Sequence, residues 1–149
     1  MKRLAMACAL LVGLLLTPLA LAQQDPYRLK LSDIMTTIQM RHIKLWFAGK
    51  LQNWELAAYE AEQIKTSLGN AAELYREIPV NYVADTVEPL RAIRDALEAK
   101  DEVRFAKAFG DLTATCNACH QVIGRAFIVM QVPTASPFSN QSFSPRGRE

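Results

Sequence analysis

Cysteine and histidine are scarce in this chain of 149 residues, which contains three cysteines and two histidines. Three cysteines are too few for the framework of several disulfides on which small secreted scaffolds depend. These few side chains are concentrated, however, because Cys116, Cys119 and His120 fall within the five residues "CNACH". The chemistry of the chain is therefore expected to centre on this motif.

Glycine and proline are sparse between residues 28 and 131, and apolar residues recur there at helical spacing. No segment shows the sustained two-residue alternation of apolar and polar residues that predicts a half-buried strand. Acid/base pairs, nucleophile triads and phosphate-binding loops are also missing. The sequence predicts an all-α protein that is not an enzyme.

Residues 1–22 have the features of a cleaved signal peptide. Lys2 and Arg3 precede an apolar run over residues 4–16, and residues 20–22 (Ala-Leu-Ala) offer an A-x-A cleavage site. The run is shorter than the ~20 residues that a membrane-spanning helix needs. We therefore expect export to the periplasm and no stable membrane span.

The mature chain is expected to be electrically neutral. The signal peptide holds two of the 17 basic residues and none of the 15 acidic ones, which leaves 15 basic residues against 15 acidic. A neutral chain lacks the net positive charge that attracts proteins to the phosphate backbone, so no nucleic-acid partner is expected. Cys8 would leave with the signal peptide, so Cys116 and Cys119 would be the cysteines of the mature protein.

Four amphipathic helices account for the region between the signal peptide and residue 130. The first is expected over residues 29–48 and ends at Gly49. The second follows a cap at Asn53 and fades near residue 75, and the third begins with the capping box "DTVE" at Asp85. The fourth starts after Asp101 and is expected to continue through Gly124 to about Met130.

Short connections between amphipathic helices predict an antiparallel four-helix bundle over residues 23–130. The last segment, 131–149, is rich in proline, serine and asparagine and has no helical period. We expect an irregular C-terminal tail. It could be disordered, or it could pack over the bundle through Phe138 and Phe143.

The "CNACH" motif admits four interpretations. A structural zinc site needs four ligands, usually from two separated pairs, and only one pair is present. A redox dithiol of the thioredoxin type is expected beside a strand, whereas this pair lies late in a helical sequence. A disulfide within one helical turn has poor geometry and closes almost no loop. Covalent haem attachment is the fourth, and C-x-x-C-H is its known spacing.

Haem attachment explains the spacing. Two thiols form thioethers with the two vinyl groups of haem, and the adjacent histidine becomes an axial ligand of the iron. On a helix, Cys116 and Cys119 lie about one turn apart and His120 lies four residues after Cys116, so the three share one side. We therefore expect one haem c per chain, held by both cysteines, with His120 as axial iron ligand.

The signal peptide, the four amphipathic helices and the segment "FAKAFGDLTATCNACHQVIGRAF" resemble the cytochrome c′ and related four-helix class II cytochromes c. The resemblance covers residues 27 to 130 at the level of architecture. It implies a haem attached at Cys116 and Cys119, with His120 as proximal ligand. The family contains six-coordinate electron carriers and five-coordinate members that bind NO or CO, and related bundles often form homodimers. The long tail after the fourth helix departs from the family pattern.

The resemblance implies that the sixth iron ligand comes from the first helix. Its inward stripe offers Met35 and His42, which are seven residues apart and share a face, whereas Met40 lies on another side. Met35 stands where the resemblance places the distal residue, and His42 is the only other imidazole in the chain. Met35, His42 and an open site all remain alternatives.

These observations predict an exported c-type cytochrome that carries electrons to or from a redox partner protein. The first alternative is a five-coordinate haem protein that binds NO or CO on the same fold. The second is a haem subunit of a larger redox complex. A filled sixth position favours electron transfer, and an open position favours gas binding.

Overall fold

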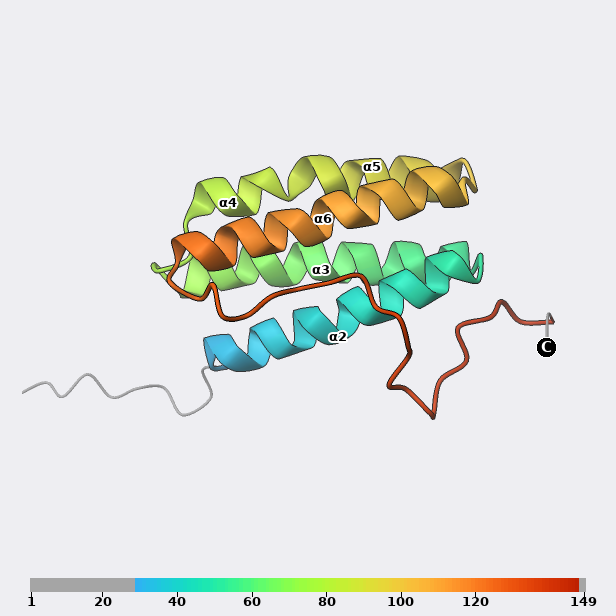
Figure 1. Ribbon diagram of the computed structural model, residues 1–149, viewed down its shortest axis with the longest axis horizontal. Helices are drawn as coiled ribbons and strands as arrows, with labels where there is room; N and C mark the ends of the chain where they lie inside the picture. Colours follow the sequence, from blue (N-terminus) through green and yellow to red (C-terminus); the bar gives the residue numbers. More distant parts are fainter. Residues whose placement is uncertain (1–28, 148–149) are drawn as a thin grey trace, which may run out of the picture.

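The computed structural model describes residues 29–147 and shows an all-helical protein (Figure 1). The predicted signal peptide, with Cys8, lies outside these residues. Within residues 29–147 there are no strands, which confirms the predicted fold class at the level of an all-α bundle. The helices are α2 (Leu31–Lys50), α3 (Trp54–Leu74), the short α4 (Val80–Asp85), α5 (Val87–Glu98) and α6 (Glu102–Val122).

The four long helices lie side by side along the length of the molecule (Figure 1). Their buried faces follow the stripes that the sequence predicts, with Ile34, Ile38 and Leu45 from α2 and Leu90 and Ile93 from α5 in one core. The core is completed by α6, whose Phe105, Phe109 and Leu112 have no exposed surface. In the part of the chain that the structure describes, no helix is long and apolar enough to cross a membrane.

A series of contacts joins α2 to α6. Lys50 forms an ion pair with Glu102. Further along, the ring of Trp46 lies 4.9 Å from that of Phe109. Still further along α6, His42 is hydrogen-bonded to Thr113. Each step towards the start of α2 therefore corresponds to a step towards the end of α6.

The prediction that Gly49 ends the first helix is wrong, because α2 continues through Gly49 to Lys50. Gly49 is buried, and a Cβ atom placed on it would lie 2.2 Å from Cζ of Phe105. The glycine is needed because the ring of Phe105 packs directly against the helix backbone. Glycine is therefore found at position 49 because Phe105 of α6 packs there, and not because it caps α2.

The predicted cap at Asn53 is confirmed, as is the predicted start of the fourth helix after Asp101, and the structure shows that Asp101 also caps this helix. The side chain of Asn53 accepts a hydrogen bond from the backbone N–H of Leu56 at 3.3 Å and begins α3. Asp101 accepts one from the N–H of Arg104 at 3.0 Å and begins α6. Both satisfy backbone donors that the first helical turn leaves without a partner.

The predicted capping box at Asp85 is wrong. Residues 80–85 already form α4, so Asp85 is helical and cannot take the extended conformation of an N-cap. Helix α5 begins at Val87 after Thr86, whose hydroxyl donates to the carbonyl of Val83 at 2.6 Å. The Glu88 carboxylate pairs with Arg91 instead of reaching back to the cap.

The prediction that the fourth helix continues to Met130 is also wrong, because α6 ends at Val122. Gly124 takes a left-handed backbone conformation with φ of 70°. Its N–H bonds the carbonyl of Gln121 at 3.2 Å, and the N–H of Arg125 bonds that of His120 at 2.7 Å. These two bonds make a Schellman motif, which stops the helix and turns the chain back.

The tail is irregular, as expected, and it packs against the bundle from α6 to α2 (Figure 1). Phe143 is buried, with its ring 5.9 Å from that of Phe47. The ammonium group of Lys44 lies 5.0 Å from the centre of the Phe138 ring. Asn53 donates a side-chain hydrogen bond to the carbonyl of Ser144 at 3.3 Å. Of the two alternatives left by the sequence, the structure has the packed tail.

Candidate haem attachment site

The last turns of α6 collect the thiol and polar side chains of the site on one side of the helix. At 100° per residue, they fall within a sector of about 160°. The members are Thr113, Cys116, Asn117, Cys119 and His120. Thr113 is buried, whereas the other four are partly exposed. The motif is therefore close enough to the core to be fixed and open enough to be reached from outside.

Both cysteines are free thiols. Burial, and then the neighbouring Cys119, raise the pKa of the Cys116 thiol to about 11. Burial also raises the pKa of Cys119. Reactive dithiols have lowered thiol pKa values, which keep a thiolate available near neutral pH. This pair has the opposite property, and its setting does not suit the redox-dithiol interpretation.

The hydrogen bond of His120 leaves one of its ring nitrogens available to a metal. Its Nδ1 lies 2.9 Å from the backbone carbonyl oxygen of Ile128. A carbonyl oxygen only accepts, so Nδ1 carries the proton and the lone pair of Nε2 is available to a metal. Histidine ligands in proteins usually donate their other ring N–H in this way, which fixes the tautomer and the ring orientation.

Asn117, between the two cysteines, holds the same returning segment at a second point. Its Nδ2 donates to the carbonyl of Met130 at 2.9 Å, and its Oδ1 accepts from the N–H of Met130 at 2.7 Å. Sequence reasoning missed Asn117 and Ile128 altogether. Gly124 was the available signal, because a glycine just after a helix often reverses the chain.

Of the two methionines on the first half of α2, Met35 is partly buried and packs against the core. Met40 is 45% exposed, which agrees with the expectation that it lies off the inward stripe. In Figure 1 the beginning of α2 and the end of α6 lie towards the same end of the bundle. The first half of α2, which contains Met35, and the last turns of α6, which contain the "CNACH" motif, therefore lie towards the same end of the bundle.

His42 is only 2% exposed, and its Nε2 lies 2.9 Å from the hydroxyl oxygen of Thr113. That hydroxyl donates its proton to the carbonyl of Phe109 at 2.8 Å, so it accepts from His42 and Nε2 carries the imidazole proton. The centres of the His42 and Phe109 rings are 4.3 Å apart. Nδ1 is buried and has no hydrogen-bond partner among residues 29–147. The hydrogen bond between His42 and Thr113 thus links α2 to α6 inside the core.

Burial lowers the pKa of His42 from 6.5 to about 4. The unfolded chain therefore takes up a proton near pH 6.5, while the folded chain stays neutral until about pH 4. We expect the free energy of unfolding to fall as the pH is lowered through this interval, by up to about 3 kcal/mol. Urea unfolding followed by circular dichroism at several pH values measures this.

A His42→Gln variant should lose that part of the pH dependence, because glutamine does not titrate. The carboxylates titrate in both proteins and cancel in the comparison. Equal slopes between pH 4 and pH 6.5 for the two proteins would contradict the assignment to His42.

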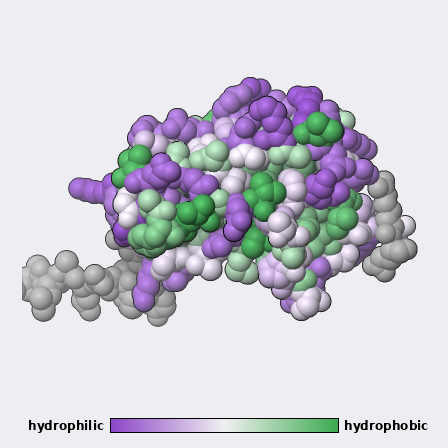
Figure 2. All heavy atoms as spheres, viewed as in Figure 1, coloured by the Kyte–Doolittle hydropathy of each residue, from purple (hydrophilic) through white to green (hydrophobic). Residues whose placement is uncertain are grey.

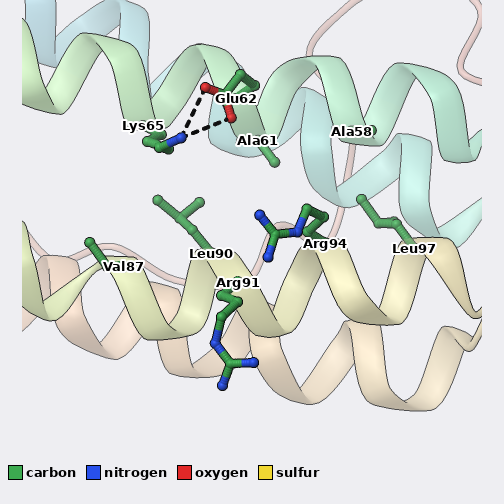
Figure 3. A pocket seen from close by; sticks show the side chains of 9 residues that line it. All are labelled: Ala58, Ala61, Glu62, Lys65, Val87, Leu90, Arg91, Arg94 and Leu97. Carbon is green, nitrogen blue, oxygen red and sulfur yellow. Dashed lines mark hydrogen bonds and ion pairs between the residues drawn. The ribbon is translucent and has the colours of Figure 1, made fainter.

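In residues 29–147, no group of three or more histidine, cysteine or acidic side chains is arranged to hold a metal ion. A zinc ion held by protein ligands alone needs such a group. Haem iron does not, because the porphyrin supplies four of its ligands. An open groove between α3 and α5 lies elsewhere, with Leu90, Leu97 and the Glu62–Lys65 ion pair among its lining residues (Figure 3). None of the "CNACH" residues lines this groove.

Hydrophobic residues form several separate groups among hydrophilic ones on the face that Figure 2 shows. After α6, Phe127 is 79% exposed and Val129 is 69% exposed. They flank Ile128, whose carbonyl accepts from His120. Apolar surface therefore borders the site.

Comparison with protein-family models, with curated proteins and with solved structures gave no match to this chain.

Proposed function

We propose that this chain is an exported c-type cytochrome that carries electrons in the periplasm. The observation that carries the proposal is His120, whose Nδ1 is committed to the Ile128 carbonyl while Nε2 stays available, directly after two free thiols on the same side of α6. The two thiols and the imidazole thus lie within five consecutive residues of α6, a little more than one helical turn. Both the motif and the resemblance to class II cytochromes c support haem c as the group they hold.

In this proposal, Cys116 and Cys119 would hold one haem through thioether bonds, and His120 would be a ligand of its iron. When bound, haem supplies an iron that alternates between ferric and ferrous states and so carries one electron. The protein sets the strength of the axial ligand and the polarity around it. The apolar border at Phe127 and Val129 would exclude water from one side of the site, and a redox partner protein would exchange the electron.

The proposal includes an antiparallel bundle with Met35 opposite the haem motif. The contacts between α2 and α6 support it, since they advance in opposite directions along the two chains, from Lys50–Glu102 to His42–Thr113. Seven residues further along each helix, about 10 Å, the same register brings Met35 level with His120. His42 is less suited to the iron, because its Nε2–H is engaged by Thr113. We therefore propose Met35 as the sixth ligand.

We expect Met35→Ala to convert a low-spin haem into a high-spin one that binds CO, because it removes the sixth ligand. The absorption and electron paramagnetic resonance spectra of both redox states measure this. Met40→Ala is the matched control, since Met40 lies on the same helix and is exposed; it should leave the spectrum unchanged. A low-spin spectrum in Met35→Ala would contradict this ligand, and its loss in His42→Ala would point to His42.

The function itself is tested by producing the whole chain in a host that matures c-type cytochromes. We expect haem that stays with the polypeptide on a denaturing gel, with a pyridine haemochrome spectrum typical of thioether-linked haem. Spectra with and without CO then separate the two haem functions. A wild-type protein that is already high-spin and binds CO readily would favour the gas-binding alternative, and absence of covalent haem would refute both.

A further inference from the structure

We infer that Asn117 is a positioning residue for the iron ligand: by clamping Met130 it holds the Ile128 carbonyl on Nδ1 of His120, an inference that rests on the proposed function. The side-chain hydrogen bonds of Asn117 go to the backbone of Met130. It acts through the backbone of the segment that returns from α6. That segment, residues 128–130, is the proximal strap.

The strap is brought to the motif by the end of α6. The Schellman motif at Gly124 reverses the chain, and the N–H of Ile128 then bonds the carbonyl of Arg125 at 2.8 Å. This turn directs the strap back along α6. Asn117 and His120 are three residues apart and share one face of α6, so they meet the strap together.

The carboxamide of Asn117 suits this task because it both donates and accepts. It bonds the N–H and the carbonyl of the same residue, Met130, at 2.7 Å and 2.9 Å. Two bonds to one residue fix its position and its orientation. The Ile128 carbonyl, two residues earlier, is thereby held 2.9 Å from Nδ1 of His120. The polar side chains at both ends of "NACH" thus hold the strap.

The expected consequence is control of the strength of His120 as a ligand. An imidazole that donates from Nδ1 to a carbonyl is a stronger base at Nε2. A stronger base favours ferric over ferrous iron and lowers the reduction potential. Releasing the strap should weaken the iron–histidine bond and raise the potential, without detaching the haem.

The test compares Asn117→Ala and Asn117→Asp with Asn70→Ala, a control on the exposed surface of α3. In the haem-loaded chain, we expect Asn117→Ala to lower the ferrous iron–histidine stretching frequency in resonance Raman spectra and to raise the reduction potential. Asn117→Asp, which keeps the acceptor for the Met130 N–H but loses the donor, should change the stretching frequency less; its added negative charge lowers the potential, so only the frequency is compared for this variant. Asn70→Ala should match the wild type in both measurements.

Hydrogen exchange of the Met130 amide is a second test of the Asn117–Met130 hydrogen bond. It can be measured on the full chain with or without haem. We expect exchange to accelerate about tenfold or more in Asn117→Ala, because the amide loses its acceptor. Unchanged exchange, or faster exchange with an unchanged stretching frequency and potential, would overturn the inference. If Asn117→Ala does not fold, the same outcomes are read from Asn117→Leu, because leucine is similar in size to asparagine and offers no acceptor to the Met130 amide. A wild type without covalent haem would refute the proposed function instead, and the exchange result would then report on the clamp alone.

Discussion

Replacing both Cys116 and Cys119 with alanine is expected to give a folded helical protein with no covalently bound haem. Neither thiol is fully buried, and each substitution removes a single sulfur atom, so the loss of packing should be small. Attachment should be lost completely, because no other cysteine lies within residues 29–147. Haem staining after denaturing electrophoresis and extraction with acidified acetone measure the result.

The matched control is Cys8→Ala, which removes the third cysteine of the chain from the predicted signal peptide. It should leave haem content unchanged. Single substitutions at Cys116 or Cys119 should leave one thioether and shift the haemochrome band. Haem that stays with the double variant under denaturing conditions would contradict the attachment site.

The second large effect is expected from Gly49→Ala in the core. The new methyl group would lie 2.2 Å from Cζ of Phe105, which has no exposed surface and lies against Trp46 and Phe109. The ring cannot move without displacing its neighbours. Alanine gains about 1 kcal/mol in helix propensity, and the overlap should exceed this gain. We expect a net loss of about 1–3 kcal/mol in the free energy of unfolding.

Gly69→Ala on α3 is the control, since it makes the same chemical change within a helix where a Cβ atom meets nothing within 4 Å. It should stabilise the protein by about 0.5–1 kcal/mol. Urea unfolding of the three proteins, followed by circular dichroism, measures both changes. If Gly49→Ala were as stable as Gly69→Ala, Phe105 would not pack against α2 as described.

Local signals in the sequence predicted the parts of the fold that depend on neighbouring residues. The apolar stripes followed from helical periodicity, and the cap at Asn53 followed from residue type. The start of the fourth helix after Asp101 was also predicted. The predictions were wrong at positions where a contact with a distant residue, or a competing local structure, determines the conformation. Gly49 resembled a helix stop, but its lack of a side chain accommodates Phe105 from α6. Asp85 resembled a cap, but the preceding residues were already helical.

The candidate site also contains residues that local sequence predicted and residues that only the fold brings together. Cys116, Cys119 and His120 were predicted because their chemistry is encoded in adjacent residues. Their support from Ile128 could not be predicted, since it depends on the chain reversing at Gly124. From the sequence alone, Met35 and His42 were both candidates for the sixth iron ligand. Only the packing of α2 on α6 distinguishes them, because it engages His42 with Thr113.

The docked tail has a consequence for the order in which the protein folds. Asn53 and Ser144 are 91 positions apart, so their hydrogen bond closes a loop of most of the described chain. The contacts between α2 and α3, or between α5 and α6, close much shorter loops and lose less chain entropy. The helical pairs should therefore assemble first and the tail last. Substitutions at Phe138 or Phe143 would then mainly accelerate unfolding and leave the rate of folding nearly unchanged.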